Sequence, residues 1–505
     1  MSLAILSSRA LLGFEAQAVR VEVHVGPGLP NFLIVGLPDA GVRESRERVR
    51  SALQSTGFEL PAGRITVNLA PADLPKDSGR YDLAIALGIL LASGQLRIPG
   101  NDGQSVLEVK DRVFVGELSL TGRLRSIKGG LAIAMAVAKD MPGIRMVMPR
   151  RGACVAAQVP GLVVLGANTL IDVVEDLAGH RELPQVLAQA ANISCSPVPC
   201  LSDVQGQEAG RRALEVAASG GHSILMCGPP GVGKSMLAQR LPGLLPPLGA
   251  LESLEVAALH GLAGHDVAPE TIPPFRSPHH TASTAAVIGG GSWPRPGEVS
   301  LAHHGVLFLD ELPEFQRPVL ESLREPLEAG VVSVARARMS CTFPAKFQLI
   351  AAMNPCPCGW AGHPRKLCSC PPVRVEAYRR RLSGPLMDRI DLHLGLSSPK
   401  EGWLHAPPGE PSAAVQERVR LCRDRQMKRQ GCVNAQLDGP ALRRYVVLDE
   451  RCAKMLGEAS ERWAWSARVV HRILRVSRTL ADMRAAERVE MADVAEALQF
   501  RPAWA

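Results

Sequence analysis

The 505-residue sequence lacks any apolar run long enough to cross a membrane. Its longest apolar stretch, LAIALGILLA at 83–92, has about half of the roughly 20 residues that a spanning helix requires, so it predicts a buried helix. The first residues lack a basic leader and are interrupted by Ser7, Ser8 and Arg9, which is not typical of a secretory signal. No long internal repeat or low-complexity tract is evident. These absences predict a cytoplasmic protein without a membrane partner.

Composition is that of a folded chain with more than one domain. Hydrophobic residues make up 46% and charged residues 21%, near the averages of globular proteins, which excludes general disorder. A chain of 505 residues is too long for one core, so about two or three domains are expected. The 12 cysteines suit thiols or metal ligands rather than disulfides in a reducing compartment. A net charge of +8 favours anionic partners without identifying one.

The order of patterns predicts an α/β multidomain fold. Residues 1–185 alternate β-rich and helical runs and predict a compact first domain. Residues 186–200 are typical of a linker, 201–397 carry the motifs of a nucleotide-binding core with a parallel sheet, and 398–505 become helical. In the first domain the expected strands are 19–25, 65–69 and 113–115, and the expected helices are 42–53 and 83–91.

A phosphate-binding loop is predicted in SILMCGPPGVGKSMLAQRL, between a strand at 223–227 and a helix. Its glycines let backbone N–H groups turn toward phosphates, Lys234 reaches the β and γ oxygens, and Ser235 ligates Mg²⁺. ATP and Mg²⁺ are therefore the predicted cofactors. The predicted ATP-binding residues of the loop are Gly228, Pro229, Pro230, Gly231, Val232, Gly233, Lys234 and Ser235.

Polar residues also follow two further apolar strands. Asp310 and Glu311 come directly after the strand at 306–309, at the edge where parallel sheets bind ligands. Asp310 is expected to support Mg²⁺, and Glu311 is expected to orient or deprotonate the attacking water. The strand at 347–353 ends at Asn354, a candidate to hold the same water or the γ-phosphate.

Two arginines are candidates to complete the site. Arg389, in SGPLMDRIDL, is predicted to reach the nucleotide of a neighbouring subunit, where a cation stabilises the charge of phosphoryl transfer. Arg468 lies near the start of the helix SARVVHRILRVSRTLADM, with Ser466 as its predicted N-cap. Three further arginines of this helix are expected to form a solvated basic face: Arg472, Arg475 and Arg478.

Four cysteines follow Asn354 in CPCGWAGHPRKLCSC. The two pairs face each other across a loop and suit a structural Zn²⁺, although each pair is spaced more tightly than is usual. His363 is an alternative ligand, and free thiols or an iron–sulfur cluster are the alternative interpretations. The predicted zinc ligands are Cys356, Cys358, Cys368 and Cys370, and we expect the metal to fix the geometry at Asn354.

Longer motifs resemble one family. FRSPHHTAS at 275–283, PGEVSLAHHGVLFLDELPEF at 296–315, AAMNPCPCG at 351–359 and RLSGPLMDRIDL at 381–392 are similar to the ComM/YifB proteins, which are magnesium-chelatase-like AAA+ ATPases. The resemblance covers nearly the whole chain. It implies that Asp310 and Glu311 are the Walker B residues, and that Asn354 is sensor 1. Arg389 would be the arginine finger and Arg468 sensor 2.

The resemblance implies a ring, expected to be a homo-hexamer, with ATP between subunits. It also implies a helicase or translocase for single-stranded or branched DNA that promotes branch migration during recombination in natural transformation, with recombination proteins as possible partners. Two alternatives stay open: a magnesium-chelatase-type motor for metal insertion, and a nucleotide-regulated scaffold. The chelatase interpretation requires a porphyrin-binding partner and an integrin-like subunit, neither of which is visible in this sequence.

In the resembling ATPases a hairpin just before sensor 1 enters the central pore. The segment VVSVARARMSCTF at 331–343 alternates β-forming residues with arginines, as is typical of such a hairpin. The segment with His279 and His280 is a second candidate for DNA contact. An ion pair at a subunit interface is the equal alternative for each arginine. The candidates are Arg336 and Arg338 in the hairpin, and Arg276 and Arg295 in the second segment.

The first domain resembles the proteolytic domain of Lon but lacks its serine–lysine dyad. PKD at 75–77 is not followed by a serine at the Lon-like position, because Ser78 comes too early. GGL at 129–131 is followed by Ala132 where the lysine should stand. The chain is therefore not expected to be a peptidase, and this domain is expected to shape the ring or handle DNA.

Overall fold

The computed structural model describes residues 2–37, 39–76, 79–99, 106–188, 198–265, 267–291, 294–336, 339–398 and 408–501. Its compact units are two: Met1–Asn192 with Ala250–Glu270, and Ile193–Gly249 with Thr271–Ala505. Most of the predicted linker, 189–197, lies outside the described residues. Residues 250–270 lie within the segment predicted as the ATPase core, yet they pack with the first unit. In the described part of the chain, no helix has the length and apolarity to span a membrane.

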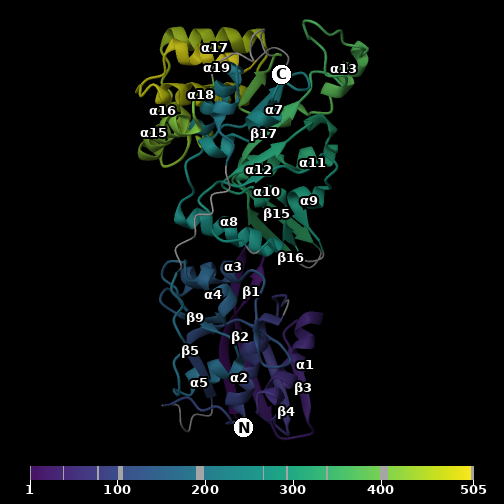
Figure 1. Cartoon of the computed structure of the whole chain (residues 1–505), viewed down its shortest axis with the longest axis vertical. Helices are drawn as coiled ribbons and strands as arrows, with labels where there is room; N and C mark the ends of the chain where they lie inside the picture. The colour runs from purple at the N-terminus through teal and green to yellow at the C-terminus, as the bar shows by residue number, and fades with distance from the viewer. Residues whose placement is uncertain are drawn as a thin grey trace. The chain divides into compact units, whose positions relative to one another are not determined.

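The first unit is built on a mixed seven-stranded sheet with the strand order β3-β4-β2-β1-β5-β8-β9 (Figure 1). β1 and β2 form a long antiparallel pair, whereas β5, β8 and β9 run parallel to one another. Crossover helices make that parallel pairing possible. The elements are β1 (Ser2–Leu12), β2 (Glu15–Gly26), β3 (Asn31–Val35), α1 (Ala40–Ser55), β4 (Arg64–Ala70), α2 (Asp82–Ala92), β5 (Val106–Phe114), β6 (Glu117–Leu118), β7 (Leu124–Arg125), α3 (Gly130–Asp140), β8 (Arg145–Pro149), α4 (Arg150–Ala156), β9 (Val163–Ala167), α5 (Leu170–Leu177) and α8 (Ala250–Ala263).

α2 confirms the predicted buried helix, because every one of its residues is buried. It approaches the sheet closely at Gly88, where an added Cβ would lie 2.4 Å from a methyl group of Val23. Its first residue, Asp82, accepts a 2.7 Å hydrogen bond from Nε of Arg48 on α1. Burial raises the pKa of Asp82 to about 6, and the hydrogen bond from Arg48 opposes that rise.

The second unit contains a parallel five-stranded sheet with the order β11-β14-β17-β10-β18. Three of its strands, β10, β14 and β17, are buried throughout, as expected for strands covered on both faces. Their carboxyl ends therefore meet at one edge, where the site residues follow. The elements are α6 (Glu208–Gly220), β10 (Ile224–Cys227), α7 (Lys234–Ala238), β11 (Phe275–Arg276), α9 (Thr284–Ile288), β12 (Gly289–Gly290), β13 (Arg295–Pro296), α10 (Glu298–Leu301), β14 (Val306–Leu309), α11 (Arg317–Ser322), α12 (Arg324–Ala329), β15 (Val331–Arg336), β16 (Met339–Pro344), β17 (Gln348–Met353), α13 (Pro372–Arg379), α14 (Gly384–Met387) and β18 (Leu392–Gly395).

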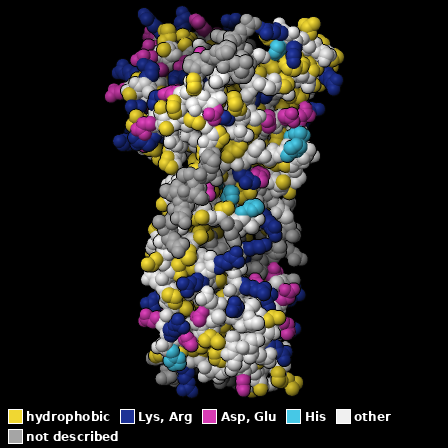
Figure 2. Space-filling view, viewed as in Figure 1, with side chains coloured by type: hydrophobic (Ala, Val, Ile, Leu, Met, Phe, Trp, Pro, Cys, Tyr) yellow, Lys and Arg dark blue, Asp and Glu magenta, His cyan; other side chains and the backbone are white. Residues whose placement is uncertain are grey.

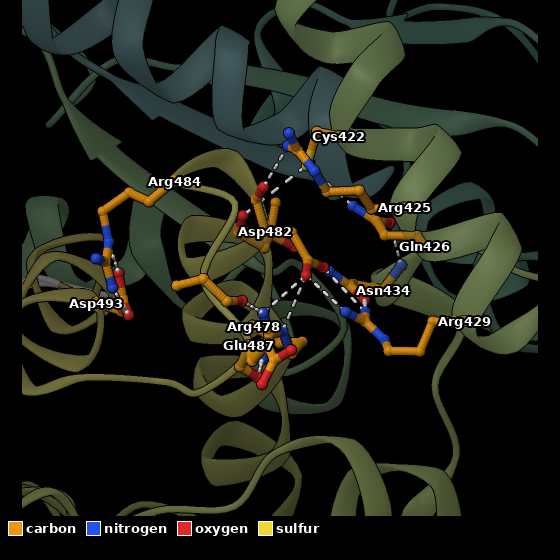
Figure 3. Close-up of polar contacts among 12 residues, drawn as sticks. Cys422, Arg425, Gln426, Arg429, Asn434, Arg478, Asp482, Arg484, Glu487 and Asp493 are labelled. Atoms are coloured by element: carbon orange, nitrogen blue, oxygen red, sulfur yellow. Dashed lines mark hydrogen bonds and ion pairs between the residues drawn. The ribbon is translucent and has the colours of Figure 1, made fainter.

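The helical end of the chain packs around a buried carboxylate (Figure 3). Asp482 on α18 accepts hydrogen bonds from Arg429 at 2.6 and 2.9 Å, from Arg478 at 2.8 and 3.2 Å, and from Asn434 at 2.8 Å. Two cations thus offset the charge of one carboxylate that is almost fully buried, and the amide adds a hydrogen bond. The helices are α15 (Ser412–Gln430), α16 (Gly439–Tyr445), α17 (Glu450–Arg462), α18 (Ala467–Met483) and α19 (Met491–Gln499).

The prediction for the arginines of α18 is partly wrong. Ser466 caps the helix as predicted, accepting a hydrogen bond from the N–H of Val469. The expected solvated face is absent, because Arg472 pairs with Asp391, Arg475 donates to the carbonyl of Leu437, and Arg478 pairs with Asp482. Arg472 and Arg475 attach α18 to neighbouring elements, whereas the carboxylate partner of Arg478 lies one turn further along α18. Hydrophobic periodicity does not reveal polar partners of either kind.

Candidate ATP site and cysteine cluster

The phosphate-binding loop lies between β10, which ends at Cys227, and α7, which begins at Lys234. Gly231 and Gly233 have φ values of +78° and +93°, a left-handed conformation that glycine adopts without strain. The ammonium of Lys234 donates to the loop carbonyls of Gly228 at 2.7 Å and Pro229 at 3.0 Å. Burial lowers the pKa of Lys234, and the nearby charge of Asp310 opposes that effect. The loop therefore holds a largely buried cation where phosphate oxygens are expected.

Four of the predicted residues meet at the edge of the sheet. Lys234 Nζ lies 3.0 Å from Asn354 Oδ1, and the hydroxyl of Ser235 donates to Asp310 Oδ2 at 2.7 Å. The loop after β10, the end of β14 and the end of β17 are thus joined by side-chain hydrogen bonds. This is the arrangement that a magnesium-bound triphosphate requires: a cation and an amide toward its oxygens, and a hydroxyl and a carboxylate toward the metal.

Glu311 stands beside this group with its side chain about half exposed, in a left-handed backbone conformation with φ +53°. Its N–H donates to Asp310 Oδ1 at 2.9 Å, and its Oε2 lies 3.2 Å from Nδ1 of His280. The sequence pattern assigns His280 only to a candidate DNA segment. Because β11 pairs in parallel with β14, residues after both strands share one edge, and that pairing was the missing signal.

The two predicted arginines lie in different environments. Arg389 is buried, with Nη2 at 2.8 Å from Glu328 Oε1 and Nη1 donating to the carbonyl of Pro385 at 2.7 Å. Arg468 is exposed on the first turn of α18. Their roles as arginine finger and sensor 2 stay predictions.

The candidate DNA arginines also differ. The predicted hairpin is confirmed as β15 and β16, which pair from Val331↔Pro344 to Arg336↔Met339. Arg338 and the side chain of Arg336 lie outside the described residues. Arg276 forms two hydrogen bonds with Glu298, at 2.6 and 2.8 Å, within the same chain, and Arg295 is exposed. Basic side chains are spread over both units on the face shown in Figure 2, so charge alone selects no DNA surface there.

The four predicted cysteine ligands converge. Sγ of Cys356 lies 3.3 Å from that of Cys358 and 3.6 Å from that of Cys368, and the ligand atoms of all four lie within 4.8 Å of one another. Backbone N–H groups of Ala361 and Cys370 point at two of the sulfurs, as suits thiolates. Four convergent sulfurs fit Zn²⁺ or an iron–sulfur cluster.

Both ring nitrogens of His363 have partners other than the four cysteines. Nε2 lies 3.0 Å from the hydroxyl of Ser398, and Nδ1 accepts hydrogen bonds from the N–H groups of Arg365 and Lys366. The four sulfurs converge without His363, and the alternative ligand set with this histidine stays a prediction. The histidine connects the cysteine loop to the segment after β18.

The Lon-like region offers one buried amine. Lys76 is fully buried and donates to the carbonyl of Pro71, and burial lowers its pKa. Asp77 and Ser78 lie outside the described residues, and Ala132 is buried in α3. The absence of peptidase activity stays a prediction.

Comparison with known proteins gives consistent matches along the chain. Three family models match in order: the subunit ChlI of Mg-chelatase at residues 21–151, magnesium chelatase, subunit ChlI, at 200–402, and the ChlI C-terminal model at 409–501. Protein YifB of Salmonella typhimurium is 45% identical over 99% of this chain and 97% of its own length. Competence protein ComM of Haemophilus influenzae is 44% identical over 99% of this chain and 98% of its own length. YifB of Escherichia coli is 44% identical, over 99% and 97%.

Proposed function

Because the chain belongs to the ComM/YifB family of ATPases with magnesium-chelatase ChlI-type domains, we propose that it is an ATP-driven DNA motor. Its substrate is single-stranded or branched DNA, on which it acts as a helicase or translocase that promotes branch migration. The work belongs to homologous recombination and natural transformation, in the cytoplasm. A homo-hexameric ring is the proposed assembly, and recombination proteins are proposed as further partners.

The observation that carries the proposal is the meeting of Lys234, Ser235, Asp310 and Asn354 beside Glu311. Lys234 and the loop N–H groups hold the β and γ phosphates, while Ser235 and Asp310 hold Mg²⁺. Asn354 fixes the γ-phosphate or the attacking water, and Glu311 takes the proton of that water. General-base groups of this kind contribute about 10²–10⁴-fold to a rate. In a ring, Arg389 and Arg468 contribute charge to the nucleotide at the subunit boundary.

We propose Zn²⁺ as the metal of the four cysteines, in a structural role. Tetrahedral sulfur sites with no open position support local folding rather than chemistry. Cys356, Cys358, Cys368 and Cys370 supply four sulfurs, which fill the four positions of a tetrahedral site and leave none for water. This suits a structural role.

A metal-insertion motor is the second candidate, because the three family models that match residues 21–151, 200–402 and 409–501 are magnesium chelatase models. That function would need a porphyrin-binding partner, whereas the nearly full-length similarity to a competence protein favours DNA. A nucleotide-regulated scaffold is the third hypothesis. The presence of all the residues expected for ATP hydrolysis disfavours it.

The deciding experiment measures the steady-state ATPase rate with single-stranded, duplex and four-way-junction DNA. We expect stimulation by DNA in the wild type and a rate lowered by about 10²–10⁴-fold in Glu311→Gln. Glu325→Gln is the matched control, since this exposed glutamate on α12 undergoes the same charge change and is not among the predicted site residues. An active ATPase that responds to no DNA would refute the DNA motor and favour metal insertion, and no hydrolysis at all would favour the scaffold.

A further inference from the structure

The cysteine loop begins at the nucleotide site. Asn354, which bonds Lys234, stands two residues before Cys356, and Cys356 is fully buried. Tyr378 on α13 is buried as well, and its burial raises the pKa of its phenol to about 12, an effect that the backbone of Asn354 opposes. Asn354 therefore lies close in sequence to the first cysteine and close in space to the helix that follows the last one.

The same loop packs directly against the phosphate-binding loop. Gly359, between the two cysteine pairs, has a φ of +83°. A Cβ added at Gly359 would lie 2.5 Å from Cδ and 2.7 Å from Cγ of Pro230. Any side chain at this position would have to displace the proline ring. The contact is thus close enough to transmit a movement of the cysteine loop to the phosphate site.

A third contact reaches the segment after β18. His363 bonds Ser398 through Nε2 and is held by two backbone N–H groups through Nδ1. A cavity of about 240 Å³ lies between these parts, and its lining includes Gly228, Pro229, His363 and Ser398. One loop therefore contacts sensor 1, the phosphate-binding loop and the strand end beside it.

We propose that the four-cysteine loop is a metal-dependent clamp on the ATP site, in which Gly359 and His363 are positioning residues. With Zn²⁺ bound, the four sulfurs have fixed mutual distances, so Gly359 and His363 are presented to Pro230 and Ser398. Without the metal, the thiols have no shared ligand, and the loop regains conformational freedom that ATP binding must then restrict. The clamp rests on the ATP-binding part of the proposed function and does not depend on DNA.

The test uses the full chain without DNA and measures affinity for a fluorescent ATP analogue with Mg²⁺. Protein stripped of zinc by a chelator, which is then removed, is compared with protein reloaded with zinc. Metal content is measured in both. We expect binding about 10-fold weaker without zinc, recovered on reloading, which corresponds to the loss of one well-placed contact.

Two variants leave every cysteine in place. His363→Ala is expected to retain zinc and the wild-type melting temperature. Gly359→Ala is expected to retain zinc with a lower melting temperature, because its Cβ displaces the ring of Pro230 in a left-handed backbone conformation. Both variants should weaken ATP binding and raise KM more than they lower kcat. Leu367→Ser is the matched control, because this side chain of the same loop is 97% exposed. It should bind ATP as the wild type does.

The outcomes separate the clamp from the proposed function. Unchanged ATP affinity after zinc removal, or in both variants, would overturn the clamp while the ATPase stands. A reloaded wild type that holds no zinc would overturn it as well. If zinc-loaded wild type bound no ATP, the proposed function would fail, and the clamp with it.

Discussion

The ion pair between Arg472 and Asp391 joins α18 to the segment that carries Arg389. Arg472 Nη1 lies 2.7 Å from Asp391 Oδ1, and the two side chains are 15% and 2% exposed. Asp391 also accepts hydrogen bonds from the N–H and the hydroxyl of Ser223, at 3.1 and 3.2 Å. Replacing Arg472 with Met keeps the packing of the stem and removes the charge, so a buried carboxylate loses its cation.

The expected loss of stability is large. Breaking a buried ion pair from one side costs about 3–5 kcal/mol. The lower end, about 3 kcal/mol, applies to Arg472→Met because Asp391 keeps the bonds from Ser223 and because Arg472 is partly exposed. Against a typical unfolding free energy of about 5–15 kcal/mol, this is a substantial fraction.

The pH dependence follows from the pKa of Asp391. Burial raises that pKa, but the charge of Arg472 and the contact with His222 outweigh it and hold the pKa well below its ordinary value of 3.8. A depressed carboxyl pKa stabilises the fold above about pH 4, and the stabilisation is lost below that. In Arg472→Met the burial is less opposed, so the pKa rises and the folded variant takes up a proton as the pH falls. The stability difference from wild type should therefore narrow between pH 8 and pH 5.

The assay is urea unfolding at pH 8, 7, 6 and 5, followed by the helical circular dichroism signal without nucleotide. Arg468→Met is the control, because Arg468 is exposed on the same helix and should change stability by less than about 0.5 kcal/mol. A loss below about 1 kcal/mol at pH 7, or a difference from wild type that stays constant with pH, would refute this reasoning.

Three further predictions concern other carboxylates. Glu311→Gln should lower ATP hydrolysis by about 10²–10⁴-fold and keep nucleotide affinity, as measured by phosphate release and equilibrium binding; a loss of affinity instead would contradict its role toward water. Asp482→Asn should cost about 3 kcal/mol, because Arg429 and Arg478 lose their counter-charge (Figure 3), and an unchanged melting temperature would argue against the network. Asp82 has a pKa raised from 3.8 to about 6 by burial, so its charged form costs stability that is recovered as the pH falls through that window. Asp82→Asn should therefore lack this gain in stability at low pH. If the melting temperatures of the wild type and of Asp82→Asn changed equally between pH 7 and pH 4, a raised pKa of Asp82 would be excluded.

Some elements were predictable because their cause is local. The phosphate-binding loop can be predicted from one short segment, because an apolar strand, glycines in left-handed conformations and a helix follow one another there. The expected strands at 19–25 and 65–69 lie within β2 and β4, and the helices at 42–53 and 83–91 lie within α1 and α2. In β2, β4 and α1 the hydrophobic periodicity matches the face that the element buries, whereas α2 is predicted by its unbroken apolar run because it is buried throughout.

β1 was missed for a physical reason. Ser7, Ser8 and Arg9 interrupt its apolar pattern, yet Ser8 and Arg9 are buried. Arg9 is accommodated because it pairs with Asp140 at 2.5 Å and donates to the carbonyl of Ala16. A polar residue inside a strand is tolerated when its partner is supplied by another element, and that partner cannot be read locally.

The order of residues alone determined the chemistry of this protein: a loop for phosphates, carboxylates after a buried strand, an amide after the next, and four sulfurs close together. Those features follow from residue type and short spacing. Folding decided which groups touch: Lys234 with Asn354, Glu311 with His280, Arg276 with Glu298, and Gly359 with Pro230. Such contacts depend on strand order and on which side chains are buried together, because the free energy of a charge or a hydrogen bond is set by neighbours that are distant along the chain.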